Sequence, residues 1–114
     1  MHELSICQSM ISIVESTMKE HPGATLRRIF LDVGQGSTIE PTLLREAFAI
    51  ITAGGPLEGV ELAIRDIPIT GRCRACGETF EYHEVALGCP ACGSLDIVID
   101  TGMELDIREL EIDD

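Results

Sequence analysis

The stretch CRACGETFEYHEVALGCPACG, residues 73–93, decides how this chain folds, because it repeats one short cysteine pattern. Two cysteines with two residues between them can point both sulfurs at one ion, and two such pairs complete a tetrahedron. A glycine follows the second cysteine of each pair, and a positive φ there lets the backbone curl and point N–H groups at the thiolates. The pattern therefore predicts one tetrathiolate metal site, with zinc as its ion, built from Cys73, Cys76, Cys89 and Cys92.

The alternative for these cysteines is a pair of disulfides, which requires an oxidising compartment. The chain opens with Met-His-Glu-Leu, without the basic and apolar regions of a signal peptide, and it has no run of about 18 apolar residues. We therefore expect a cytoplasmic protein, where paired cysteines usually bind metal. The net charge of −12, from 20 acids and 8 bases, argues against nucleic acid and anionic membranes as partners.

Outward from the cysteines, the spacing of apolar residues predicts an α+β fold. Apolar residues recur every three or four positions over residues 4–18 and again after Pro41, which indicates two helices. Alternation of apolar and polar residues indicates strands at residues 24–33, at residues 60–65 and in the tail, where Gly102 interrupts it. The expected architecture is two helices packed on a three-stranded sheet, with an inserted zinc-ribbon module.

The expected domain boundaries follow from the place where the cysteine module interrupts the alternating strands. Residues 1–67 together with residues 97–114 are expected to form an α/β domain that includes the N-terminus. Residues 68–96 are expected to form the inserted four-cysteine zinc-binding domain. This insert has too few apolar residues to fold without a metal, so its folding should depend on zinc.

The N-terminus carries the second unusual feature, a histidine at position two. A large second residue normally prevents removal of the initiator methionine, so we expect Met1 to keep a free amine. The Met1 amine, the His2 amide nitrogen and the His2 imidazole can then close two chelate rings on one ion, with Glu3 or water completing the ligands. Ni(II) and Cu(II) suit such planar nitrogen ligation, whereas Zn(II) rarely does. Taken alone, a histidine at position two is usually only an exposed terminal residue.

The opening MHELS and the two Cys-x-x-Cys pairs together resemble the HypA/HybF family, the nickel-delivery metallochaperones of [NiFe]-hydrogenase maturation. Length, acidic balance and element order agree as well, so the resemblance covers the whole chain. It implies a carrier rather than an enzyme, with transient Ni(II) at Met1, His2 and Glu3 and structural Zn(II) at the four cysteines. It also implies two partners, the nickel-binding GTPase HypB and the [NiFe]-hydrogenase large subunit.

Three other functions are weighed against the same residues. A zinc-ribbon module that binds nucleic acid is opposed by the acidic charge and by the lack of a basic-aromatic face. A rubredoxin-like electron carrier would place iron on the same four thiolates, and metal content and colour would separate it from a zinc protein. A hydrolase is the weakest alternative, because the chain has no Ser-His-Asp pattern and no three-ligand zinc motif with an open position.

Three further residues carry metal-binding atoms outside both predicted sites. Cys7 lies on the apolar stripe of the first predicted helix and is expected to be a core residue. His21 follows that helix, where a cation is favoured, and His83 lies within the cysteine module, where a surface position is expected. These three are the next candidates for nickel if it does not bind at the N-terminus.

Overall fold

The computed structural model describes residues 2–82 and 88–113 of the chain. The chain divides into two units, the first being residues 1–31, 39–65 and 106–114 and the second being residues 32–38 and 66–105. Within the described residues, none of the helices combines the length and the apolar character needed to span a membrane.

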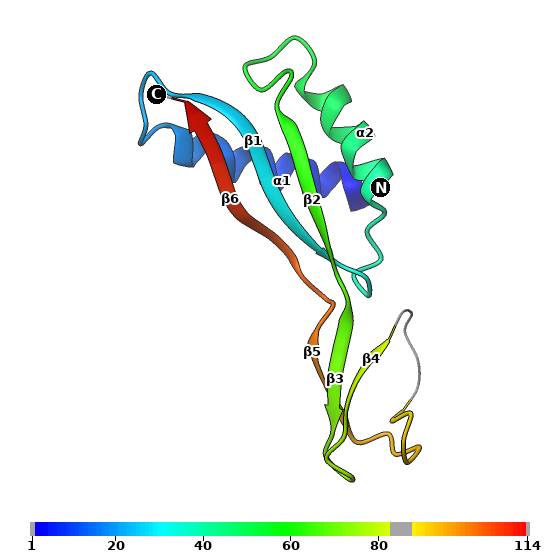
Figure 1. Ribbon diagram of the computed structural model, residues 1–114. Coiled ribbons are helices and arrows are strands. Elements are labelled where there is room, and N and C mark those ends of the chain that lie inside the picture. Colours follow the sequence, from blue (N-terminus) through cyan, green and yellow to red (C-terminus); the bar gives the residue numbers. More distant parts are fainter. Residues whose placement is uncertain (1, 83–87, 114) are drawn as a thin grey trace. The chain divides into compact units, whose positions relative to one another are not determined.

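The two helices of the first unit each bury one face (Figure 1). α2 (Pro41–Thr52) begins with a proline, whose missing N–H costs nothing in the first turn of a helix. The carboxylate of Glu40, which precedes it, caps the helix by accepting a hydrogen bond of 2.9 Å from the N–H of Thr42. α1 (His2–Met18) packs against α2 and buries three side chains that recur at helical spacing, Cys7, Met10 and Val14.

The three strands that accompany these helices pair in the order β2-β1-β6. The central strand is β1 (Thr25–Gly34), and the edges are β2 (Glu61–Ile67) and β6 (Leu105–Asp113). In Figure 1, β1 and β2 run in the same direction, β6 runs in the opposite direction, and the helices cover one face of the sheet. The apolar core of the first unit is made of Cys7, Met10, Val14, Leu26, Ile29, Leu31, Leu44, Phe48, Leu57 and Leu62.

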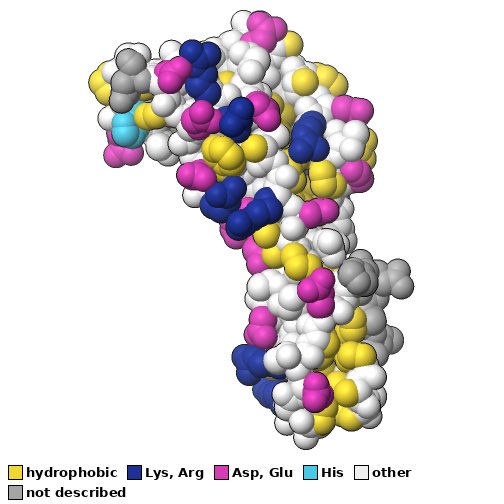
Figure 2. Space-filling view, viewed as in Figure 1, with side chains coloured by type: hydrophobic (Ala, Val, Ile, Leu, Met, Phe, Trp, Pro, Cys, Tyr) yellow, Lys and Arg dark blue, Asp and Glu magenta, His cyan; other side chains and the backbone are white. Residues whose placement is uncertain are grey.

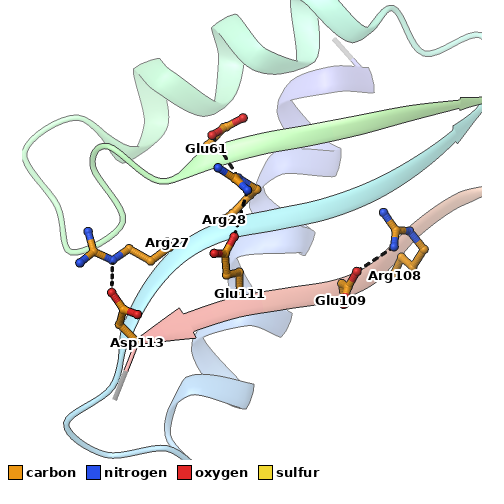
Figure 3. A network of polar contacts seen from close by, with 7 residues as sticks. All are labelled: Arg27, Arg28, Glu61, Arg108, Glu109, Glu111 and Asp113. Carbon is orange, nitrogen blue, oxygen red and sulfur yellow. Dashed lines mark hydrogen bonds and ion pairs between the residues drawn. The ribbon is translucent and has the colours of Figure 1, made fainter.

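The other face of this sheet carries charged side chains in pairs (Figure 3). Arg28 on the central strand contacts both edges, with 3.1 Å to Glu61 and 3.1 Å to Glu111. The Phe30 ring lies beneath two guanidinium groups, 5.8 Å from Arg28 and 5.2 Å from Arg108. Figure 2 shows acidic and basic side chains interspersed on the face that it draws. Exposed pairs of this kind contribute less than about 1 kcal/mol each, so the core rather than this face stabilises the sheet.

The second unit is built on a separate three-stranded antiparallel sheet with the order β4-β3-β5. The strands are β3 (Ile69–Cys73), β4 (Thr79–Tyr82) and β5 (Ile97–Thr101). Gly71 leaves no room for a side chain between the strands, because a Cβ there would come within 2.5 Å of the Val98 carbonyl oxygen and 2.9 Å of the Phe80 ring. Only glycine fits this position without displacing the neighbouring backbone.

The predicted fold class is confirmed, since two helices pack on a three-stranded sheet and a cysteine module is inserted between its strands. One feature was not foreseen: the residues around Ile97 and Ile99 pair with β3 of the second unit rather than with the helix-covered sheet. Gly102, with a φ of 111°, separates β5 from β6, and these two strands belong to different sheets. Residues 97–105 therefore lie in the second unit, whereas independent folding of the two domains stays a prediction.

Candidate metal centre

The four paired cysteines of the second unit converge, with all four sulfur atoms within 4.8 Å of one another. The Sγ atoms of Cys73 and Cys92 lie 3.7 Å apart, as do those of Cys76 and Cys89. A tetrahedron with metal–sulfur bonds of about 2.3 Å has sulfur–sulfur edges of about 3.8 Å, so the cluster has the size that a zinc tetrathiolate requires. A disulfide would need about 2.05 Å between sulfurs, and all four cysteines are free.

Each cysteine pair forms the same hydrogen-bonded turn. In the first turn, the N–H of Cys73 donates to the carbonyl of Glu78 at 2.8 Å, and the N–H of Gly77 donates to the carbonyl of Cys73 at 2.9 Å. The second turn repeats this arrangement, with Cys89 in the position of Cys73 and Gly93 in the position of Gly77. Both of its hydrogen bonds are 2.8 Å long. The repeated sequence therefore produces a repeated backbone, and two copies of this backbone supply the four sulfurs.

The glycine after each pair has the predicted positive φ, 80° at Gly77 and 77° at Gly93. This conformation closes the turn and lets backbone N–H groups approach the first sulfur of each pair. The N–H of Cys76 lies 3.5 Å from the Cys73 sulfur, and the N–H of Ala91 lies 3.3 Å from the Cys89 sulfur. Such donors stabilise negative charge on sulfur, which is the form that binds metal.

The electrostatics of the cluster also favour a bound cation. The backbone N–H of Cys76 lowers the pKa of Cys73 to about 7. The N–H of Glu78 acts in the same direction on Cys76, but burial and the neighbouring thiols Cys89 and Cys73 outweigh it and raise the pKa of Cys76 to about 12. Four thiols this close cannot all ionise beside one another, whereas a divalent cation removes the repulsion and displaces their protons.

Contacts outside the sulfurs hold the two turns together. The backbone N–H of Arg74 donates to the carbonyl of Asp96 at 2.9 Å, and the Arg74 guanidinium lies 2.8 Å from the Asp96 carboxylate. The Tyr82 hydroxyl, at the end of β4, donates to the carbonyl of Gly88 just before the second turn. Sequence reasoning missed these contacts, and the only signal for the first was a pair of opposite charges, one inside the first cysteine turn and one after the second.

His2 and Glu3, two of the predicted nickel ligands, are the first residues of α1. Met1 and the side chain of His2 lie outside the part of the chain that is described. Glu3 is described, and its carboxylate accepts a hydrogen bond of 3.4 Å from the N–H of Glu40, the cap of α2. The N–H groups of Glu3 itself and of Glu40 lower the pKa of Glu3, so its carboxylate stays ionised at neutral pH. Glu40 is a site neighbour that sequence reasoning did not identify.

The other candidate ligands lie apart from the four-sulfur cluster or cannot be placed. Cys7 is fully buried, and its sulfur lies 3.6 Å from the Leu44 carbonyl, as expected of a core residue. Burial raises the pKa of the Cys7 thiol, which disfavours the thiolate that metal binding needs. His21 is exposed in the turn after α1. His83 lies outside the described residues.

Comparison with known proteins agrees with the resemblance noted above. The family described as "Hydrogenase/urease nickel incorporation, metallochaperone, hypA" matches residues 1–112. A hydrogenase maturation factor HypA from Nostoc punctiforme is 41% identical over 114 residues, which cover 100% of this chain and 97% of that protein. A HypA from Desulfitobacterium hafniense is 36% identical over 114 residues, 100% of both chains.

Two solved structures share the fold. The solution structure of a HypA protein superimposes with a TM-score of 0.72 at 24% identity, covering 98% of this chain and 96% of that chain. The solution structure of the Ni metallochaperone HypA from Helicobacter pylori gives a TM-score of 0.66 at 23% identity and covers 96% of each chain. With a family match from end to end, a four-sulfur cluster and a helix that starts at His2, this chain belongs to the HypA family of nickel incorporation metallochaperones.

Proposed function

We propose that this metallochaperone carries Ni(II) on the Met1 amine, the His2 amide nitrogen and the His2 imidazole, with Glu3 supplying a further ligand. The family description, which names nickel incorporation, supports nickel as the cargo. The observation that most supports this placement is the start of α1 at His2. Amides in the first turn of a helix have no intrahelical acceptor, so a metal can take them without breaking the helix.

The position of Glu3 fits a site that must release its ion. Its carboxylate is ionised and lies near the N-terminal cap of α2, so it can approach a cation while it remains held by the Glu40 N–H. The N-terminus of a helix carries partial positive charge, which weakens the binding of a cation there. Chelation by few ligands against this field favours transfer over permanent retention.

The four cysteines bind Zn(II) in a structural role in this proposal. The sulfur–sulfur distances and the two identical turns support a closed tetrahedral site. Four thiolates leave no open coordination position for a water or substrate, so we propose that the protein is not an enzyme. Metal analysis of the purified protein tests this assignment: one zinc per chain supports it, whereas iron and a red colour would support the electron carrier instead.

The acceptor of the nickel is proposed to be the [NiFe]-hydrogenase large subunit, with the GTPase HypB as a partner in loading. The family description and the names of the relatives, hydrogenase maturation factors, support a hydrogenase target. A cytoplasmic location suits free thiols, because the cytosol keeps them reduced. The net charge of −12 supports protein partners over nucleic acid or anionic lipid.

Calorimetric nickel titration tests the proposed site. The comparison is between the native protein, the His2→Ala variant and a protein with a short N-terminal extension that removes the Met1 amine. Both changes should abolish high-affinity nickel binding, because each removes one chelate ring, while zinc content stays the same. His21→Ala is the matched control, since it removes a different histidine of the first unit, one that is exposed, and it should bind nickel like the native protein. Equal affinities in all four proteins would rule out the N-terminal site.

A further inference from the structure

The edge strand β5 of the second unit offers a binding surface that neither proposed metal site uses. β5 pairs with β3 on one side, and no strand among the described residues pairs with its other side (Figure 1). An open edge of this kind presents backbone N–H and C=O groups that an extended peptide can pair with. The backbone of β5 is therefore suited to accept an added strand.

The pairing of β5 with β3 determines which backbone groups face the open edge. The N–H of Arg74 donates to the carbonyl of Asp96, and in an antiparallel pair every second residue hydrogen-bonds to the same neighbouring strand. Val98, which lies opposite Arg72, therefore turns its backbone groups toward β3. Ile99 turns its N–H and C=O away from β3. A residue opposite Ile99 on an added antiparallel strand can thus exchange two hydrogen bonds with it.

Exposed apolar side chains concentrate at the same edge. Among the described residues of the second unit, the large apolar side chains that are exposed belong to Leu95, Ile99 and Met103, at 75%, 37% and 51%. Ile99 lies within β5, and the other two flank this strand in the sequence. The edge strands β2, β4 and β6 have no exposed large apolar residue in their described parts. Only at β5 would an added strand gain exposed apolar contacts as well as hydrogen bonds.

The side chain of Ile99 shares one face of the small sheet with that of Ile97, because residues two apart in a strand point the same way. The residue opposite Ile99 on β3 is Gly71, and the Phe80 ring lies against this glycine. Ile97 and Phe80 are both half-buried. An aliphatic side chain placed opposite Ile99 would therefore have apolar neighbours on this face.

The charge of the second unit selects a cationic partner. The unit contains eight acidic residues and two arginines, and four thiolates around a zinc ion add negative charge in our assignment. The arginines are already paired at the edge, Arg72 with Asp100 at 3.3 Å and Arg74 with Asp96 at 2.8 Å. The two residues beside the one opposite Ile99 would lie next to Val98 and Asp100, so a lysine or arginine there would add a cation to an acidic surface.

We propose that β5 binds a basic extended segment of a partner protein, which joins the sheet as a fourth strand. The segment runs antiparallel to β5, with an aliphatic residue opposite Ile99 and lysine or arginine on either side of it. A second copy of β5 does not have this chemistry, because antiparallel pairing about Ile99 would place Val98 opposite Asp100 and supply no cation. The surface involves no nickel ligand, so its failure would leave the proposed nickel site untouched.

The experiment uses the full-length, zinc-loaded protein and a short, capped, fluorescent peptide in which valine and lysine alternate. Fluorescence anisotropy should show binding with a Kd below about 1 mM, and amide hydrogen exchange at Ile99 should slow in the complex. Two methylated peptides of equal charge test the pairing. Methylation of the valine nitrogens removes the donors that face β5 and should weaken binding at least about tenfold, whereas methylation of the lysine nitrogens leaves those donors in place and should not.

Ile99→Lys tests the position on the protein and should also weaken binding at least about tenfold, because it adds a cation and removes the apolar contact. Ile50→Lys is the matched control, since it makes the same change at a side chain of α2 that is 74% exposed, and it should bind like the native protein. Circular dichroism and zinc content confirm that both variants are folded. No binding up to about 1 mM, equal binding of the two methylated peptides, or native-like binding by the Ile99→Lys variant would each overturn the proposal.

Discussion

Removing two zinc ligands from opposite turns should unfold the second unit and leave the first unit intact. Of the apolar residues buried among those described, ten belong to the first unit and five to the second, the latter being Val33, Ile69, Cys73, Tyr82 and Cys89. Two of these five are zinc ligands in our assignment, so the second unit has little core apart from the metal site. The double variant Cys76→Ser, Cys89→Ser removes one sulfur from each turn.

The expected effect is large in comparison with the stability of a small domain. Structural zinc contributes an apparent binding free energy of about 10–16 kcal/mol in small zinc-dependent folds, whereas whole domains are stable by about 5–15 kcal/mol. The free energy lost with the ion is therefore larger than three buried side chains and two short strand pairings can compensate. Limited proteolysis should cut the double variant within residues 66–105, and metal analysis should find no bound zinc.

Circular dichroism separates the two units in this experiment. Both helices, 17 and 12 residues long, belong to the first unit, so the helical signal should persist in the double variant. Cys7→Ala is the control, because it removes the cysteine outside the cluster and should keep one zinc per chain. Stoichiometric zinc in the double variant would refute the assigned ligands, and complete loss of the helical signal would show that the units fold as one.

Three smaller changes test other contacts. Gly71→Ala places a Cβ within 2.5 Å of the Val98 carbonyl oxygen, so the second unit should lose about 1–3 kcal/mol of its free energy of unfolding. Denaturation followed by the fluorescence of the chain's single tyrosine measures this loss. An unchanged denaturation midpoint would refute the close approach. The N–H groups of Glu3 and Glu40 hold the pKa of Glu3 in the folded protein below 4.5, so its ionised carboxylate stabilises the fold above pH 4.5 and this stabilisation is lost as the pH falls through the folded-state pKa. Glu3→Gln should therefore lose less stability in acid than the native protein does. Unfolding curves between pH 3 and pH 7 measure the difference. Nickel binding should weaken below about pH 6.5 as the N-terminal amine and the His2 imidazole take up protons, and titration at several pH values checks this.

The sequence was informative wherever one local pattern determines the structure. The three-and-four spacing of apolar residues over residues 4–18 predicted α1 and the burial of Cys7 and Val14, although Met10 rather than Leu4 completes the buried face, and Pro41 marked the start of α2. The alternation after Gly102 predicted a strand correctly. It could not show that Ile97 and Ile99 pair with β3, because the choice of sheet depends on contacts between residues distant in sequence.

The same distinction applies to the metal centre. The motif Cys-x-x-Cys-Gly contains its own turn, so the convergence of four sulfurs and the positive φ at Gly77 and Gly93 followed from the spacing alone. The contacts that support the sites join segments far apart in the chain. Arg74 meets Asp96 across 22 residues, and Glu3 meets the Glu40 cap across 37, and no local rule connects either pair.

The two proposed sites differ in the way that a carrier requires. The cysteine cluster takes its ligands from two turns, each closed by backbone hydrogen bonds, so a sulfur that leaves the ion stays beside it and binds again before the other three can dissociate. The proposed N-terminal site would take its ligands from Met1 and the first residues of α1, where backbone amides have no acceptor within the helix. Ligands on neighbouring residues at a helix end can leave one at a time, so an acceptor protein can replace them stepwise. In this proposal one ion maintains the structure while the other is transferred, and both sites are accommodated in 114 residues.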